Sequence, residues 1–160
     1  NAGNNDGTCK TARETRAIAG WFESDRDTDT RLNKWGREIY PKCAYNTLML
    51  RKERYGNIPI YVTENGHGCY DVPDENGYVE DDDRIAFLND YIGWILKAKE
   101  DGVNVKGYYC WSTMDLYSWI NGYKKRYGLV RVDYEDGLLR RIPKKSYYWY
   151  RDFIAEHKDV

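Results

Sequence analysis

Residues 58–66 read Ile58-Pro59-Ile60-Tyr61-Val62-Thr63-Glu64-Asn65-Gly66, and the rest of the expected fold is built around them. Their apolar, β-branched run has the length of a strand and ends in one carboxylate, which the turn dipeptide Asn-Gly follows. In a barrel of alternating strands and helices, strand ends deliver side chains to the mouth where catalytic residues sit. Glu64 is therefore a candidate catalytic carboxylate, with a solvated residue at a turn as the alternative.

Alternating elements are predicted on either side of this strand. A helix should begin at Pro41, carry apolar residues at helical spacing and stop at Gly56. After a turn-rich loop, the acidic run 81–83 should cap a second helix that ends at Gly102. The apolar run 103–111 reads as a second strand. The order helix, strand, helix, strand predicts an α/β fold with a parallel strand pair and a right-handed crossover.

The C-terminal part predicts a hairpin and a last helix. The runs 129–132 and 138–142 flank a turn that contains Gly137. Pro143 is suited to the first turn of a helix, and the apolar positions after it recur at helical spacing.

The N-terminal residues and the small number of strands set the expected domain organisation. Residues 1–34 predict an irregular loop segment, and residues 35–160 the structured part. Two parallel strands are too few for a sheet that is buried on both faces, so further strands are expected outside this sequence.

Composition excludes several classes of partner. The 160 residues carry 25 basic and 26 acidic side chains, so no net field favours nucleic acid or an anionic membrane. No run approaches the roughly 18 apolar residues of a membrane span, and we expect a soluble, cytoplasmic protein. The 6 Trp and 16 Tyr against 3 Phe suit surfaces that stack and hydrogen-bond together, such as sugar sites.

Cysteine and histidine indicate no metal site. The four cysteines have no metal-ligand spacing, and we expect all of them to be reduced: Cys9, Cys43, Cys69 and Cys110. Cys43 and Cys110 lie in apolar patterns and are predicted to be small buried hydrophobes. His67 and His157 are far apart and outside any ligand pattern. No metal or organic cofactor is implied.

The segment 112–127 predicts a long aromatic and basic loop at the end of the second strand. Aromatic rings offer flat faces to sugar C–H groups, while Ser, Lys and Tyr side chains can donate to an oxyanion. A glutamate facing such a loop suits glycoside cleavage, in which a carboxylate attacks the sugar carbon. The alternative is a packed corner with a solvated face at Lys124, Lys125 and Arg126.

Five long motifs, in order and at matching spacing, carry a resemblance to a known family. They read Glu38-Ile39-Tyr40-Pro41, Ile60-Tyr61-Val62-Thr63-Glu64-Asn65-Gly66, Gly107-Tyr108-Tyr109-Cys110-Trp111-Ser112-Thr113-Met114-Asp115, Gly122-Tyr123-Lys124-Lys125-Arg126-Tyr127-Gly128-Leu129 and Arg141-Ile142-Pro143-Lys144-Lys145-Ser146. From about residue 35 onward, the chain resembles the C-terminal part of glycoside hydrolase family 1, the β-glucosidase family of (β/α)8 barrels. The resemblance implies that the two strands are the seventh and eighth of a barrel that this chain leaves incomplete.

The resemblance also implies roles for individual residues. Glu64 would be the nucleophile of a retaining mechanism, Trp111 the platform beneath the sugar, and Asp115 a residue that holds its loop. The family's acid/base glutamate lies in an Asn-Glu-Pro motif, which is absent here. Retaining hydrolysis needs two carboxylates about 5–5.5 Å apart, so the isolated chain is expected to be inactive.

One position separates subfamilies. Where the β-glucosidases carry a glutamate, this chain has Ser118, and with Lys125 and Tyr127 it resembles the phosphate clamp of the 6-phospho-β-glycosidases. A glutamate would repel a phosphate dianion, whereas a hydroxyl, an ammonium and a phenol all donate to it. Lys124 and Arg126, at alternating positions, should point elsewhere. The chain also resembles the phospho-β-galactosidases in having a tryptophan at position 119. Trp119 therefore favours galactosides, or a dual specificity, as substrates.

The expected substrate is thus a phosphorylated β-disaccharide imported by a sugar phosphotransferase system, and the expected partner is the remaining N-terminal part of the barrel. Two alternatives stay open for the isolated chain: a sugar-phosphate-binding module without turnover, or a domain completed by a partner chain. Unphosphorylated β-glucosides are the alternative substrate.

Overall fold

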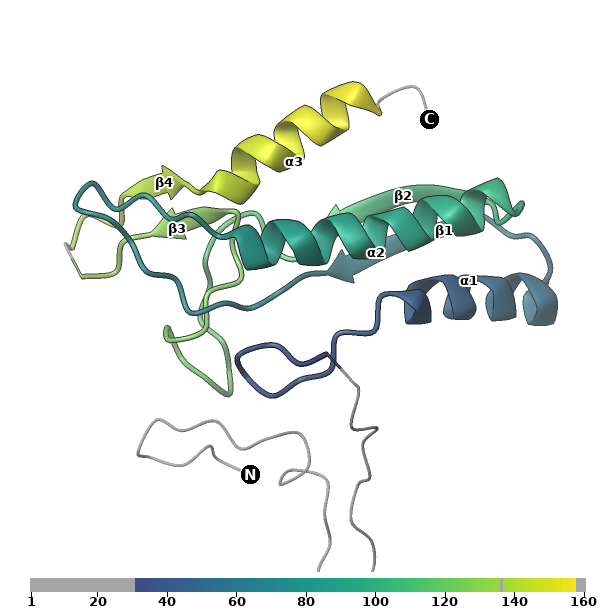
Figure 1. Cartoon of the computed structure of the whole chain (residues 1–160), viewed down its shortest axis with the longest axis horizontal. Coiled ribbons are helices and arrows are strands. Elements are labelled where there is room, and N and C mark those ends of the chain that lie inside the picture. The colour runs from purple at the N-terminus through teal and green to yellow at the C-terminus, as the bar shows by residue number, and fades with distance from the viewer. Residues whose placement is uncertain (1–30, 136, 158–160) are drawn as a thin grey trace, which may run out of the picture.

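The computed structural model describes residues 31–135 and 137–157. The elements are α1 (Lys42–Tyr55), β1 (Ile60–Asn65), α2 (Asp82–Glu100), β2 (Val105–Cys110), β3 (Val130–Val132), β4 (Arg141–Pro143) and α3 (Lys145–Glu156) (Figure 1). They match the predicted order. The expectations for residues 1–30, including a reduced Cys9, lie outside the described residues.

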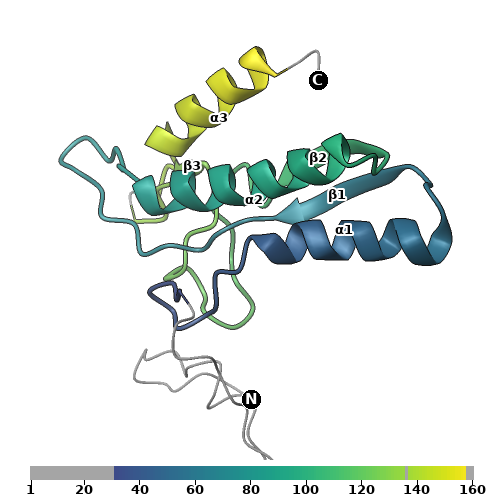
Figure 2. The same cartoon turned by 45° about the vertical axis from the view of Figure 1, so that its right-hand side comes forward.

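The strands β1 and β2 pair in parallel, as predicted, with Tyr61 opposite Gly107. One face of this sheet packs on α1 and α2, where a buried cluster contains Leu48, Ile95, Ala98 and Val103. Figures 1 and 2 show α1 and α2 running along the two strands. On the other face the side chains of Tyr61 and Tyr109 are 56% and 57% exposed. Among the described residues, β1 and β2 pair only with each other.

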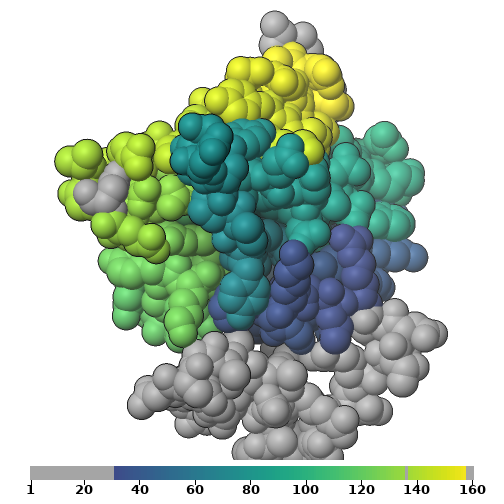
Figure 3. Space-filling view, turned by 60° about the vertical axis from the view of Figure 1, so that its left-hand side comes forward, coloured from purple at the N-terminus to yellow at the C-terminus, as the bar shows by residue number. Residues whose placement is uncertain are grey.

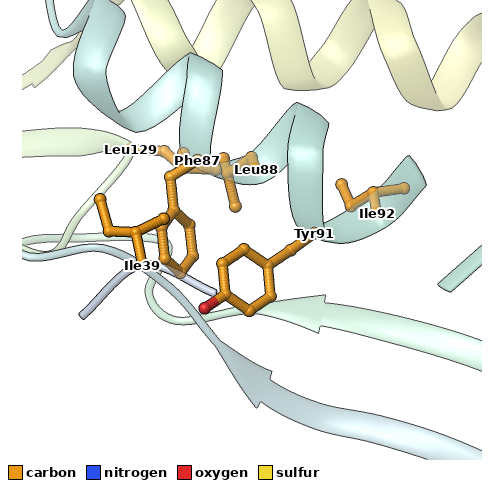
Figure 4. Packing of buried hydrophobic residues seen from close by; sticks show 6 residues of the cluster. All are labelled: Ile39, Phe87, Leu88, Tyr91, Ile92 and Leu129. Carbon is orange, nitrogen blue, oxygen red and sulfur yellow. The ribbon is translucent and has the colours of Figure 1, made fainter. Parts of the chain in front are cut away.

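A second apolar cluster fixes α2 against the segments on either side of it. Its members are Ile39, Phe87, Leu88, Tyr91, Ile92 and Leu129 (Figure 4). Leu88 is fully buried, and the rings of Phe87 and Tyr91 stack with centres 4.2 Å apart. The cluster joins α2 to the segment before α1 and to the start of the C-terminal hairpin, so it holds the loops at one end of the sheet.

The antiparallel pair β3 and β4 confirms the predicted hairpin, but the expectation that Pro143 begins the last helix was wrong. Pro143 is the last residue of β4, opposite Val130. The amide of Lys144 still donates to the carbonyl of Leu129 at 2.9 Å, so the chain follows the hairpin for one residue more. α3 begins at Lys145. Proline has no amide to donate to a ladder, and a position at the end of a strand tolerates that loss.

The acidic run lies at the start of α2, as predicted, but its first residue does not cap the helix. Asp81 makes no side-chain capping bond. Its carboxylate instead accepts bonds from the hydroxyl and the amide of Ser146, at 2.6 and 2.8 Å, and pairs with Arg84. Both glycine stops are confirmed: Gly56 and Gly102 have φ of 76° and 87°, which favour glycine.

The three cysteines within the described part of the chain are free, as expected, but they differ in burial. Cys69 is buried and Cys110 is half-buried, whereas Cys43 is exposed on α1, so the prediction of a buried Cys43 was wrong. A regular helical pattern does not say which neighbouring elements exist to cover a given position. None of the helices in residues 31–157 combines the length and the apolar content that a membrane span requires.

Candidate active site

Glu64 and Trp111 are held at the same end of the sheet. Glu64 is the penultimate residue of β1 and is exposed. Trp111 follows β2 directly, and its amide donates to the carbonyl of Asn65 at 2.9 Å. Gly66 leaves no space between the two strand ends, because a Cβ there would lie 1.6 Å from the carbonyl oxygen of Trp111. The bond between Trp111 and Ser112 is cis.

A tyrosine on β2 fixes the residue that follows Glu64. The hydroxyl of Tyr108 donates to Oδ1 of Asn65 at 2.8 Å. Burial raises the pKa of Tyr108, so it remains a neutral donor. The backbone that carries Glu64 is therefore tied on both sides, by Trp111 and by Tyr108.

The loops 66–81 and 112–129 lie side by side beyond the strand ends. Cys69 and Arg126 exchange two backbone hydrogen bonds, of 2.8 and 3.0 Å. Within the second loop, the amide of Ser112 donates to the carbonyl of Tyr127 at 3.2 Å and closes the loop near its ends. Figure 3 shows this face, where the teal loop after β1 runs between the green segment after β2 and the purple residues that precede α1.

Lys125 is buried, with its ammonium between two aromatic rings. The nitrogen lies 5.0 Å from the centre of the Trp35 ring and 5.4 Å from that of Tyr127. Trp35 in turn stacks on Tyr70, with ring centres 4.1 Å apart. The lysine stem crosses Gly68, where a Cβ would lie 2.3 Å from Cε of Lys125. An ammonium over aromatic faces is attracted by the ring quadrupoles.

This burial excludes the alternative of a solvated Lys-Lys-Arg face at two of its three positions. Lys125 is buried, and Arg126 is half-buried against Tyr134, 4.9 Å from the ring centre. Only Lys124 is exposed. Trp35 and Gly68 were not predicted as site residues. Their signal was weak, because both lie far from the basic loop in sequence and neither carries a charge.

Ser118 and Trp119 lie on a tight turn within the second loop. The backbones of Ser118 and Gly122 exchange hydrogen bonds of 2.9 and 2.7 Å. The hydroxyl of Ser118 accepts a long contact of 3.4 Å from the side chain of Asn121. Trp119 is 95% exposed at the tip. The structure thus brings Lys125 and Tyr127 together, while Ser118 lies at the base of the turn and Trp119 extends into solvent.

Asp115 holds its loop, as expected. Its carboxylate accepts bonds from the amides of Gly128 and Val132, at 2.9 and 3.3 Å, and from the ammonium of Lys144 at 2.8 Å. Lys144 is fully buried and also pairs with Asp71 at 2.5 Å. Burial raises the pKa of Asp71, and the charges of Lys144 and Arg84 oppose that shift. The role of Lys144 was missed, although it lies in a recognised motif.

His67, three residues after Glu64, is buried and neutral at neutral pH. Its ring stacks on Phe87, with centres 4.9 Å apart. Burial, and then the charges of Arg84 and Lys125, lower its pKa to about 4. It is not a proton donor near pH 7. Among the described residues, no group of three or more His, Cys, Asp or Glu side chains could hold a metal ion.

A strand-end carboxylate and a tryptophan thus lie at one end of the sheet, and the loop that follows the tryptophan carries a buried cation. Residues 3–159 match the sequence profile of Glycosyl hydrolase family 1, and the chain belongs to this family.

The chain is similar to proteins of two kinds within this family. The chain is 44% identical to a 6-phospho-beta-galactosidase of Staphylococcus epidermidis over 145 residues, which cover 89% of this chain and 30% of that protein. The corresponding protein of Staphylococcus aureus is 42% identical. Among solved structures, a family 1 β-glucosidase of Thermotoga maritima is 40% identical with a TM-score of 0.76, over 84% of this chain and 29% of the other. The complex of a β-glucosidase of Thermotoga maritima with galacto-hydroximolactam is 39% identical with a TM-score of 0.77. This match covers 87% of this chain and 31% of the other.

The chain thus spans about 30% of the length of the curated relatives it matches. A part of a (β/α)8 barrel fits both this coverage and the parallel, one-sided sheet of β1 and β2.

Proposed function

We propose that this chain supplies the C-terminal part of a retaining 6-phospho-β-glycosidase, with β1 and β2 as the seventh and eighth barrel strands. The observation that carries the proposal is the buried ammonium of Lys125, held between Trp35 and Tyr127 in the loop that follows Trp111. A fixed cation and a phenol offer charge-assisted hydrogen bonds to a phosphate. The names of the Staphylococcus relatives support a phosphorylated substrate.

The clamp consists of Ser118, Lys125 and Tyr127. A lysine already ordered by its packing loses little further side-chain freedom when an anion binds, which favours affinity. The hydroxyl of Ser118, on the turn of the same loop, would donate a hydrogen bond to the phosphate. Trp119 at the tip of this turn would contact the sugar and favour the galacto configuration.

In the reaction, Glu64 attacks the anomeric carbon and forms a glycosyl-enzyme ester, while Trp111 lies beneath the sugar ring. Water then cleaves the ester with retention of configuration. The leaving oxygen needs a proton, and no Asn-Glu-Pro motif supplies the acid here. We infer that the N-terminal part of the barrel provides it, and that the isolated chain does not turn over. Because the disaccharide is phosphorylated as it is imported, we expect the reaction to take place in the cytoplasm.

Two other functions have specific support. Similarity to the Thermotoga maritima β-glucosidase favours unphosphorylated β-glucosides. The buried ammonium of Lys125 would serve equally well in a sugar-phosphate-binding module without turnover.

Glycosyl fluorides test all three, because fluoride leaves without a proton. Intact mass would be measured after incubation with 2-deoxy-2-fluoro-β-galactosyl fluoride and with its 6-phosphate. The chain would be tested alone and after refolding with the part of the Staphylococcus epidermidis relative that it does not match.

We expect one covalent adduct from the 6-phosphate, none with Glu64→Gln, and an unaltered yield with Glu53→Gln, an exposed control on α1. Faster labelling by the unphosphorylated fluoride would favour a β-glycosidase. Binding of galactose 6-phosphate without an adduct in either sample would favour the module.

A further inference from the structure

Six charged side chains form a buried network that joins the two loops to α2 and to the residue before α3. They are Asp71, Asp81, Arg84, Asp115, Arg126 and Lys144, and their side chains are at most 15% exposed. Arg84 pairs with Asp81 and, at 3.5 Å, with Asp71. Lys144 lies 2.5 Å from Asp71 and 2.8 Å from Asp115. Three cations thus meet three carboxylates, and the network is neutral.

Stability alone does not account for such a network. Removing six charges from water is costly, and apolar side chains of similar volume often stabilise a buried region at least as well. A buried ionic network does, however, fix the positions of the backbone segments that carry its side chains, because each ion pair forms only when both partners are correctly placed. Specification of a backbone geometry is therefore the role to look for.

The network contacts the backbone at the clamp. A guanidinium nitrogen of Arg84 donates to the carbonyl oxygen of Arg126 at 2.9 Å. Arg126 lies between Lys125 and Tyr127, the two clamp residues that the structure brings together. Two positions further, the amide of Gly128 donates to Asp115 at 2.9 Å. The segment 125–128 is thus held by its backbone at two points, both within the network.

We propose, on the basis of the phosphate clamp proposed above, that Arg84 is a positioning residue for this clamp. It acts through the carbonyl of Arg126 and fixes the directions in which Lys125 and Tyr127 leave the backbone. Asp81 orients the guanidinium, and Ser146, whose hydroxyl donates to Asp81 at 2.6 Å, orients Asp81 in turn. The helices α2 and α3 thereby set the geometry of a loop whose side chains bind the substrate.

The test compares Arg84→Lys with Arg151→Lys in the full chain. Lysine keeps the charge at position 84 but loses the planar fork that serves Asp81 and the carbonyl together. Arg151 is an exposed arginine on α3 and is the matched control. Hydrogen exchange would be followed at the paired amides of Cys69 and Arg126, with α1 as the internal reference. Calorimetry would give the affinity for galactose 6-phosphate and for galactose.

We expect Arg84→Lys to speed exchange at Cys69 and Arg126 at least tenfold with no change in α1. It should weaken binding of galactose 6-phosphate about tenfold and leave the affinity for galactose unaltered. Exchange that stays as slow as in the wild type, or that rises equally in α1, would overturn the positioning role. Should Arg84→Lys fail to fold, Ser146→Ala removes one bond of the same relay and should give the same pattern at smaller size.

Failure of the proposed function has a different signature. A wild-type chain that binds galactose 6-phosphate no better than galactose would refute the phosphate clamp. The exchange at Cys69 and Arg126 would still decide whether Arg84 holds the segment.

Discussion

The ammonium of Lys125 lies 5.0 Å from the centre of the Trp35 ring, although Trp35 precedes α1 and Lys125 follows β2. Two segments that are far apart in the sequence therefore meet around one charge. The stem of the same lysine passes over Gly68, so a third segment forms the floor. The position of this cation depends on packing from three loops.

Gly68→Ala should weaken sugar-phosphate binding more than it weakens the fold. The new Cβ would lie 2.3 Å from Cε and 2.7 Å from Cγ of Lys125, so the lysine stem must shift, but the three atoms nearest to the Cβ include none of the backbone. We expect the affinity for galactose 6-phosphate to fall about tenfold, about 1.4 kcal/mol, and the free energy of unfolding by less than about 1 kcal/mol. Calorimetry and urea unfolding would measure the two. Gly93→Ala, with open space around the Cβ, is the control, and an equal loss of affinity there would contradict the argument.

Gly66→Ala should act on stability, because its neighbour cannot move aside. The added Cβ would lie 1.6 Å from the carbonyl oxygen of Trp111 and 2.6 Å from its carbonyl carbon, both of which belong to the backbone. We expect a loss of about 3 kcal/mol in the free energy of unfolding, the upper part of the usual range for overpacking. Urea unfolding followed by tryptophan fluorescence would measure it. A loss no greater than that of Gly93→Ala would show that the strand ends separate easily.

His67 should make stability depend on pH between about 6.5 and 4. Burial, aided by Arg84 and Lys125, lowers its pKa from 6.5 to about 4, so the unfolded chain binds a proton that the folded chain excludes. The contribution of neutral His67 to the free energy of unfolding is therefore fully present above pH 6.5. It is lost as the pH falls towards 4, and the loss is about 3 kcal/mol. His67→Phe should remove this component. Unfolding curves from pH 4 to 7 for both proteins would test it, and parallel pH profiles would contradict it.

Lys144→Met should be among the most destabilising changes in the chain. The substitution leaves Asp71 and Asp115 buried without the cation that lies 2.5 and 2.8 Å from them. Breaking a buried pair in this way costs about 3–5 kcal/mol. The neighbouring Lys145→Met removes only a partly exposed pair with Asp82 and should cost less than about 1 kcal/mol. Similar losses for the two variants would show that the network is not desolvated as the structure indicates.

Local patterns predicted the elements well, and long-range contacts account for the errors. The β-branched run before Glu64, the helix between Pro41 and Gly56 and the turn at Gly137 all use rules that act within a few residues. Pro143 was misplaced because two neighbouring elements suit a proline, and only the pairing with Val130 decides between them. The exposure of Cys43 could not be predicted, since it depends on which segments cover α1.

The candidate site was predictable at the residues that carry a recognisable motif. Glu64 and Trp111 follow from strand ends that must meet in a parallel pair, and the structure holds them together. The burial of Lys125 was not predictable, because a Lys-Lys-Arg run is equally compatible with a solvated surface. Arg84 was overlooked since its partners lie in the loop after β1, in the loop after β2 and, through Asp81, at the start of α3.

The neutral network also limits how this sequence can change over time. Loss of one charge leaves an opposite charge stranded in the interior, so tolerated replacements at Asp71, Arg84, Asp115 and Lys144 should come in balanced sets. Surface positions such as Lys124 carry no such restriction. In a library that varies one position at a time, the network would look immutable, whereas paired libraries should recover acid–base exchanges and apolar replacements.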